Sequence, residues 1–103
     1  MAKKLFRKVS SKRKTTKVIK RDGRAERFQY RKMLSSIRKA MAHAHVRSPD
    51  LAESLAKEAV GMINRKYKGK PVPVEAIKET VEFVLVKNKL PNVAKAYILY
   101  RYM

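Results

Sequence analysis

The sequence predicts a mostly helical α+β fold, in which an N-terminal β-hairpin forms a small antiparallel sheet that caps a four-helix bundle. The period of the apolar residues changes from two to about 3.6 after Phe28, as expected where a strand gives way to a helix. Asp22-Gly23, between two short extended runs, is a strong hairpin signal. Three successive helices should begin at prolines, which are favoured at the first helical position, namely Pro49, Pro73 and Pro91.

The chain is expected to hold one domain preceded by a basic arm. Its 103 residues suffice for one domain and not for two. Residues 1–17 have few apolar side chains, so burial cannot offset the entropy of ordering them, and we expect a flexible arm followed by a folded domain over 18–103. The arm has no acidic residue, and its cations are Lys3, Lys4, Arg7, Lys8, Lys12, Arg13, Lys14 and Lys17.

The hairpin is expected over residues 17–28. Its turn is predicted to be type I′ at Asp22-Gly23, which needs a positive φ at both central residues. Val18 then shares a face with Lys20, and Glu26 with Phe28, at the strand period of two. We expect a sheet of two or three strands at one side of the helices.

Four helical segments should follow. An apolar stripe predicts the first over roughly 30–45. Ser48 is a good N-cap for the second, which runs to Arg65 and Lys66 at its negative end. The third begins at Pro73, and the fourth begins at Pro91 and continues to the chain end.

Composition restricts the possible functions. The formal charge is +19, from 27 Lys and Arg residues against 8 Asp and Glu, so anionic partners are expected: nucleic acid, nucleotides, an acidic protein or an anionic membrane surface. Without cysteine there is no disulfide, thiolate zinc site or cysteine nucleophile. His43 and His45 should point to different sides of a helix, so no metal site is predicted. No activated nucleophile or acid–base pair is visible, and we expect a protein that is not an enzyme.

The location is expected to be cytoplasmic. The start of the chain lacks the apolar run of a secretory signal. The longest apolar stretch is too short to span a bilayer, so no membrane partner is predicted.

The hairpin is the most informative element for binding. Lys20 and Arg21 stand before the turn and Arg24 after it, and cations at one edge of a rigid hairpin can surround a polyphosphate. Glu26 is the one acidic residue among them and could accept hydrogen bonds from a ribose or an adenine amino group, or hold a phosphate-bound metal. The alternative is a solvated turn in which Glu26 is only a salt-bridge partner.

Two separated stretches resemble the ATP-cone domain family. The first is residues 18–28, VIKRDGRAERF, with Lys32 and residues 35–40; the second is Val81-Glu82, Leu85 and residues 94–101. The resemblance covers about 17–102 and implies a regulatory domain that binds ATP or dATP, with the presence of Mg²⁺ left open. Carried over residue by residue, it implies that the nucleotide-binding residues are Val18, Lys20, Arg21, Glu26, Lys32 and Lys78.

Two functional hypotheses follow. The first is a stand-alone ATP cone, because no catalytic domain follows and no zinc ribbon precedes; nucleotide occupancy would control homo-oligomerisation or binding to a regulated protein partner. The second is a basic nucleic-acid-binding protein, architectural in role, which uses the cone as a scaffold and contacts DNA or RNA through the arm. Both can hold together if the two sites are linked.

Overall fold

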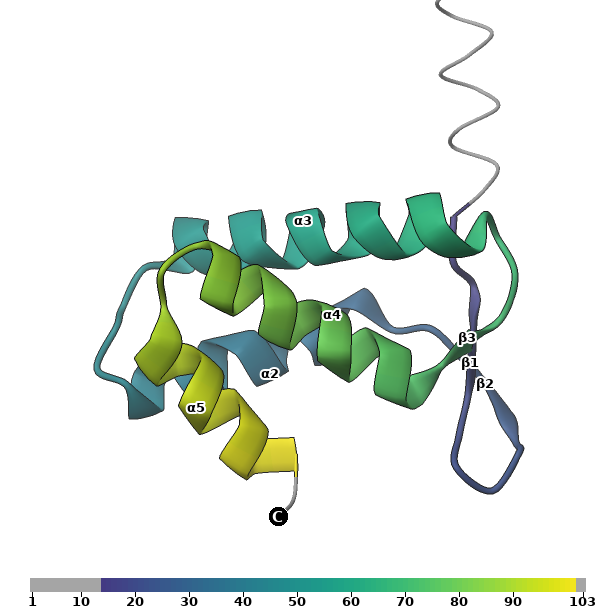
Figure 1. Ribbon diagram of the computed structural model, residues 1–103, viewed down its shortest axis with the longest axis horizontal. Coiled ribbons are helices and arrows are strands. Elements are labelled where there is room, and N and C mark those ends of the chain that lie inside the picture. The colour runs from purple at the N-terminus through teal and green to yellow at the C-terminus, as the bar shows by residue number, and fades with distance from the viewer. Residues whose placement is uncertain (1–13, 102–103) are drawn as a thin grey trace, which may run out of the picture.

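A computed structural model describes residues 14–101 of the chain (Figure 1). Its elements, in order, are β1 (Lys17–Ile19), β2 (Ala25–Arg27), α2 (Tyr30–His43), α3 (Pro49–Tyr67), β3 (Val72–Pro73), α4 (Val74–Lys87) and α5 (Pro91–Arg101). The fold is therefore mostly helical, with a small sheet near the N-terminus and four helices in the described part of the chain. The prediction of a hairpin that caps a bundle is confirmed only in this coarser form, and the hairpin turn extends beyond the helices (Figure 1).

The sheet has three strands in the order β2-β1-β3. β1 and β2 are antiparallel, with Lys17 opposite Arg27 and Val18 opposite Glu26. β3 is parallel to β1 and places Val72 beside Val18. Because α4 begins directly after β3, this short pairing holds the first turn of α4 next to the hairpin.

The hairpin turn differs from the predicted type I′ form. The amide of Gly23 donates to the carbonyl oxygen of Lys20 at 2.9 Å, and the amide of Lys20 donates to the carbonyl oxygen of Arg24 at 2.8 Å. Gly23 has a φ of 86°, whereas Asp22 is not among the residues with positive φ. This pattern is that of a three-residue loop, a turn followed by a left-handed glycine, so the type I′ prediction is wrong.

Helix boundaries follow the local signals closely, with one correction. Ser48 caps α3 as predicted, and its Oγ accepts a hydrogen bond from the amide of Leu51 at 3.3 Å. Pro73 is not the first residue of a helix but the N-cap of α4, with an extended ψ of 139°, because it also belongs to β3. α2 ends at His43, two residues before the expected end.

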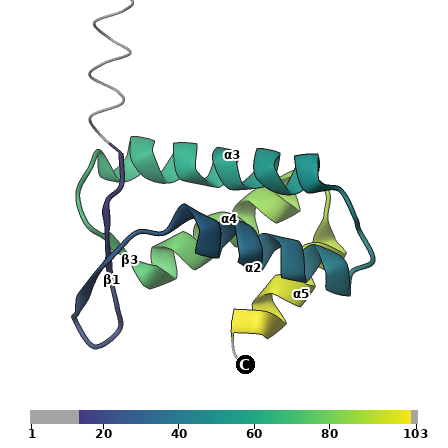
Figure 2. The same cartoon turned by 180° about the vertical axis from the view of Figure 1, so that it is seen from behind.

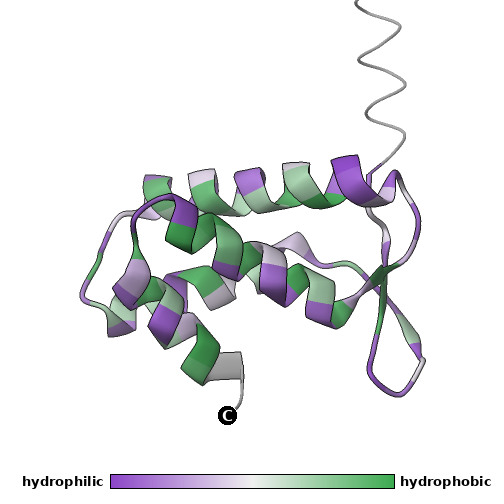
Figure 3. Ribbon diagram, viewed as in Figure 1, coloured by the Kyte–Doolittle hydropathy of each residue, from purple (hydrophilic) through white to green (hydrophobic). Residues whose placement is uncertain are grey.

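The core lies between the four helices, with α2 packed on α3 and α5, and α4 packed on the same two helices. The predicted stripe of α2 faces inward, and Ile37 is fully buried together with Leu55 of α3 and Leu85 of α4. Hydrophobic residues accordingly follow the inner helix faces, and the hairpin is largely hydrophilic (Figure 3). Within residues 14–101, no helix is long and apolar enough to cross a membrane.

The predicted arm falls mainly outside the described residues and remains a prediction. Its last residues are described: the amide of Thr15 donates to Oδ1 of Asn64 on α3 at 2.8 Å, and Lys17 begins β1. The start of the described chain is thus attached to the C-terminal half of α3.

Candidate functional site

A pocket of about 230 Å³ opens where the hairpin meets the first turns of α2 and α4. β1 and β2 form one wall, the segment that leads into α2 forms the second, and the start of α4 forms the third. Figure 2 shows α2 in front of α4, with the hairpin beyond their first turns. The pocket is lined by Val18, Lys20, Glu26, Arg27, Phe28, Gln29, Lys32, Met33, Ser36, Val74, Ile77, Lys78 and Tyr97.

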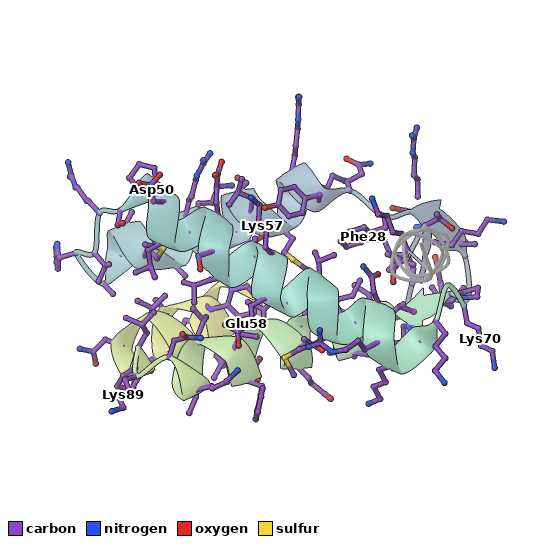
Figure 4. All side chains as sticks on the ribbon, turned by 90° about the horizontal axis from the view of Figure 1, so that it is seen from above. Phe28, Asp50, Lys57, Glu58, Lys70 and Lys89 are labelled. Carbon is purple, nitrogen blue, oxygen red and sulfur yellow. The ribbon has the colours of Figure 1, made fainter. Side chains whose placement is uncertain are left out.

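The pocket has an apolar interior and a charged rim. Val18, Met33 and Tyr97 are each less than a tenth exposed and belong to the buried side of their elements. Phe28, in the segment between the sheet and α2, packs against the core (Figure 4). An apolar interior with a few polar groups at its edge is typical of small-molecule sites.

A second pocket of about 310 Å³ adjoins the first at the hairpin turn. The two pockets share Lys20, Val74 and Lys78 in their linings, and the second adds Arg21, Asp22 and Arg24. The linings therefore change from largely apolar in the first pocket to largely cationic in the second. Together they match the two chemical halves of a nucleotide, an aromatic base and an anionic phosphate chain.

The cations of the second pocket are paired with carboxylates. Nε and Nη2 of Arg21 both lie 2.8 Å from Oε1 of Glu75, at the start of α4. Nζ of Lys78 lies 4.0 Å from the same oxygen. Glu75 therefore links the hairpin turn to α4.

Two further pairs lie within the hairpin. Nζ of Lys20 is 3.7 Å from Oε1 of Glu26, and Nε of Arg24 is 2.6 Å from Oδ2 of Asp22. Glu26 is thus a salt-bridge partner, as one sequence interpretation held, and it also lines the first pocket, as the other required. An anion that binds here competes with these carboxylates for the same cations.

The structure brings the residues of the predicted nucleotide site together. Five of the six, namely Val18, Lys20, Glu26, Lys32 and Lys78, line the first pocket. The sixth, Arg21, lines the second. Lys32 reaches the pocket from the first turn of α2, and Lys78 from the second turn of α4, so three separate elements supply the cations.

Sequence reasoning missed several residues that line the pockets or pair with their cations. Glu75 carries no local signal, because its partner Arg21 stands 54 positions away. Phe28 follows the strand period and Ile77 and Tyr97 the helix period, and nothing in their spacing distinguishes a core side chain from a pocket wall.

The predicted nucleic-acid-binding residues are described only at the end of the arm. Lys14 and Lys17 are exposed. The remaining members, Lys3, Lys4, Arg7, Lys8, Lys12 and Arg13, lie outside the described residues. Among residues 14–101, no group of three or more His, Cys, Asp or Glu side chains is placed to hold a metal ion.

Comparison with known proteins identifies the sequence pattern. The family model described as the ATP cone domain matches residues 16–103. The chain is similar to the anaerobic ribonucleoside-triphosphate reductase of Haemophilus influenzae, with 29% identity over 85 residues. It is also similar to the vitamin B12-dependent ribonucleoside-diphosphate reductase of Thermoplasma acidophilum, with 39% identity over 89 residues. Each match covers 82% of this chain but only 12% and 11% of the respective reductases.

Proposed function

Because the chain belongs to the ATP-cone domain family, we propose that it binds ATP or dATP in the two adjoining pockets, and that occupancy controls its self-association or its binding to a partner. ATP cones are nucleotide-binding regulatory domains of ribonucleotide reductases, and they are not catalytic. The observation that carries the proposal is the convergence of Lys20, Lys32 and Lys78, from three elements, on the rim of an apolar pocket.

The base and ribose are assigned to the first pocket. Val18, Ile77 and Tyr97 offer apolar surface to a flat heterocycle, and Glu26 and Gln29 at the rim can accept or donate hydrogen bonds to polar groups of a base or sugar. This division accounts for an acidic residue inside a basic site, because a carboxylate accepts hydrogen bonds from an amino or hydroxyl group.

The phosphates are assigned to the second pocket. Lys20 and Lys78 lie at its border with the first, and Arg21 and Arg24 lie at the turn. Arginine offers a planar pair of donors to phosphate oxygens, and lysine a compact charge. A Mg²⁺ ion carried with the phosphates would take most of its ligands from them and from water, and a carboxylate such as Glu75, which pairs with Arg21 and Lys78 of the second pocket, would supply one more.

A route from occupancy to assembly is supported by the exposed apolar side chains of α4 and α5. Phe83, Val86 and Leu99 are each more than half exposed, and exposed apolar side chains that form one patch mark interaction sites. α4 and α5 also supply Ile77 and Tyr97 to the pocket wall. A nucleotide that shifts these helices therefore changes the presentation of an apolar surface, which suits self-association or partner binding.

The binding site is tested by calorimetric titration of the full chain with ATP, dATP, GTP and inorganic triphosphate at near-physiological salt, with and without Mg²⁺. Saturable binding of ATP or dATP, well above both controls, is expected. Replacement of Lys20 and Arg21 together by Ala should abolish this binding with the helical circular dichroism unchanged. Lys57→Ala with Lys70→Ala, which removes the same charge from exposed positions away from the pockets, should leave it intact. Equal, salt-sensitive heats for all four ligands would refute a base-reading site.

The regulatory part is tested by sedimentation velocity with and without saturating ATP. We expect the distribution of oligomers to change with nucleotide, and the change to disappear in a Phe83→Ser variant that still binds ATP. If the distribution of oligomers is the same with and without ATP, and ATP recruits no partner, nucleotide control of assembly is contradicted. That result would leave the proposal of the nucleotide site standing.

A further inference from the structure

The outer face of α2 is a strongly basic surface that the nucleotide site does not use. The sequence has no acidic residue between Glu26 and Asp50, and this interval contains all of α2. Arg31, Arg38 and Lys39 are exposed on the helix. Lys32 and Ser36 of the same helix line the pocket, whereas Arg31 and Arg38 lie on another side of α2. Lys39 lies two turns beyond Lys32 on its side of the helix and does not line the pocket.

Arg31, Arg38 and Lys39 have no carboxylate partner in the part of the chain that the structure describes. Each ion pair found within residues 14–101 involves the hairpin turn, α3 or α4, and none includes Arg31, Arg38 or Lys39. α5, which packs against α2, has no acidic residue either. The carboxylates lie on the hairpin, α3 and α4, as Figure 4 illustrates for Asp50 and Glu58 of α3. Uncompensated charge of one sign is therefore concentrated on one part of the molecule.

The sheet edge that leads into α2 extends this surface. Lys17 and Arg27 are directly opposite each other on β1 and β2, and both are exposed. The amide of Phe28 donates to the carbonyl oxygen of Thr16, next to the Lys17–Arg27 pair. Hydrogen-bonded and non-hydrogen-bonded pairs alternate in an antiparallel ladder, so Lys17 and Arg27 form a non-hydrogen-bonded pair, in which opposing side chains are closest. Like charges in such a pair destabilise a sheet, and a bound anion relieves the repulsion.

An open concavity of about 360 Å³ lies at this pair and is lined by Thr16, Lys17, Ala25, Glu26 and Arg27. β2 is an edge strand of the sheet and connects through two residues, Phe28 and Gln29, to the first turn of α2. Arg27 and Arg31 are thus four positions apart along the chain, so the basic pair at the sheet edge leads into the basic helix.

Helical spacing gives the face a regular repeat. Arg31 and Arg38 are seven residues apart, which places them about 10 Å apart along the axis on nearly the same side of α2. That distance corresponds to about three phosphates of one strand of a nucleic-acid duplex. The residues between them on this side are small or basic, with Ser35 exposed and Ala42 exposed one turn beyond Arg38. A backbone of phosphates can therefore approach the helix closely.

We propose that the surface formed by Lys17, Arg27, Arg31, Arg38 and Lys39 binds the sugar–phosphate backbone of a nucleic acid. An acidic protein is a poorer match, because protein interfaces have an apolar centre and the exposed large apolar side chains of the described chain lie on α4 and α5. Protein–nucleic acid interfaces are more polar and more positively charged. Contacts to phosphates alone carry no sequence information, so the binding is independent of sequence. This surface lies on the folded domain, apart from Lys17, the last cation of the arm, and it shares Arg27 with the lining of the first pocket.

The test is fluorescence anisotropy of the full chain with short duplex DNA, measured over a series of salt concentrations. The patch variant Arg31→Ala/Arg38→Ala/Lys39→Ala should lower the salt slope by about 2 to 3, and the affinity about a hundredfold at 0.15 M salt, because each phosphate contact contributes about 0.9 to the slope. The control Lys57→Ala/Lys70→Ala/Lys95→Ala removes three charges from α3, the loop between α3 and β3, and α5, and it should change both values little. Circular dichroism establishes that each variant is folded.

The comparison of ligands separates the sources of phosphate. Duplex RNA of equal length is measured beside DNA, and tighter binding of either one identifies the nucleic acid and supports the proposal. Equal losses in the patch and control variants would overturn it, because net charge and not this face would then be responsible. Polyglutamate of the same charge is measured as well. If it binds as tightly as DNA and loses the same affinity in the patch variant, the proposal is overturned in favour of an acidic protein. Calorimetry with ATP should be unaffected in the patch variant, which separates this proposal from the nucleotide site.

Discussion

Replacement of Glu75 by Gln tests whether the nucleotide competes with carboxylates for the cations of the second pocket. Glu75 binds Arg21 at 2.8 Å and lies 4.0 Å from Lys78. A triphosphate that takes over Arg21 and Lys78 must break these contacts. We therefore expect Glu75→Gln to bind ATP more tightly, although it removes a residue of the site.

The magnitude follows from the exposure of the pair. Arg21 is 66% exposed, so the ion pair is screened and contributes about 0.2–1 kcal/mol, or a factor of about 1.5 to 5 in affinity. Loss of the repulsion between the carboxylate and a phosphate about 4 Å away adds about 1 kcal/mol in water, a further factor of about 5. The dissociation constant of ATP should thus fall by about seven- to twenty-fivefold.

Calorimetry with and without Mg²⁺ measures this effect, and Glu79→Gln on the exposed part of α4 is the matched control. An increase in the dissociation constant of Glu75→Gln under both conditions would refute the competition argument, since Glu75 would then position Arg21 for the ligand. An increase only with Mg²⁺ would contradict competition in favour of a metal-binding role.

Three further predictions concern the fold. Hydrogen bonds from the Lys87 ammonium and the Asn88 amide hold the pKa of Glu58 below its usual value of 4.5. The stability that this shift provides is complete above the pKa of Glu58 in the unfolded state, and it is lost as the pH falls through the lower pKa of the folded state. Glu58→Gln should therefore cost at most about 1 kcal/mol of unfolding free energy at pH 7. In urea titrations, the difference in unfolding free energy between the variant and the original chain should close below pH 4.5. A difference that persists unchanged at acid pH would show that ionisation of Glu58 is not its cause. Gly23→Ala should cost about 1 kcal/mol of unfolding free energy, because Gly23 has a φ of 86°, which is strained for alanine. No atom lies within 4 Å of the new methyl group, so no steric clash adds to this cost. Calorimetry should show Tm lowered by several degrees, and an unchanged Tm contradicts the turn assignment. Ile37→Ala, at a fully buried position of α2, should cost about 2–5 kcal/mol in chemical denaturation, and a cost below 1 kcal/mol would contradict its place in the core.

The helices could be predicted from the sequence because their signals are local. The stripe of α2 corresponds to its buried residues, and Ser48 with Pro49 defines the start of α3 through a capping hydrogen bond and a fixed φ. These features depend on residues a few positions apart, so periodicity and composition are sufficient to detect them.

The remaining features depend on contacts distant in sequence. β3 has two residues and owes its existence to pairing with β1, which no local pattern indicates. That pairing displaces the start of α4 from Pro73 to Val74 and places Glu75 beside Arg21. The turn type was also mispredicted, because Asp-Gly fits both a two-residue and a three-residue loop, and the cross-strand hydrogen bonds select the second.

The candidate site shows the same division. The resemblance to a family indicated the charged residues, which the hairpin, α2 and α4 do bring together. The apolar wall formed by Ile77 and Tyr97 came only from the structure, because a side chain that lines a pocket has the same helical spacing as one in the core.

The most direct test of the central claim is mapping of amide chemical shifts in a ¹⁵N-labelled sample of the full chain during titration with ATP. The account predicts that the largest, saturable changes fall on the two pockets, at Val18, Arg21, Lys32, Ile77 and Lys78, and that inorganic triphosphate shifts the hairpin turn but not Ile77. Changes spread over exposed lysines of all helices, alike for ATP and triphosphate, would contradict a nucleotide site in this fold.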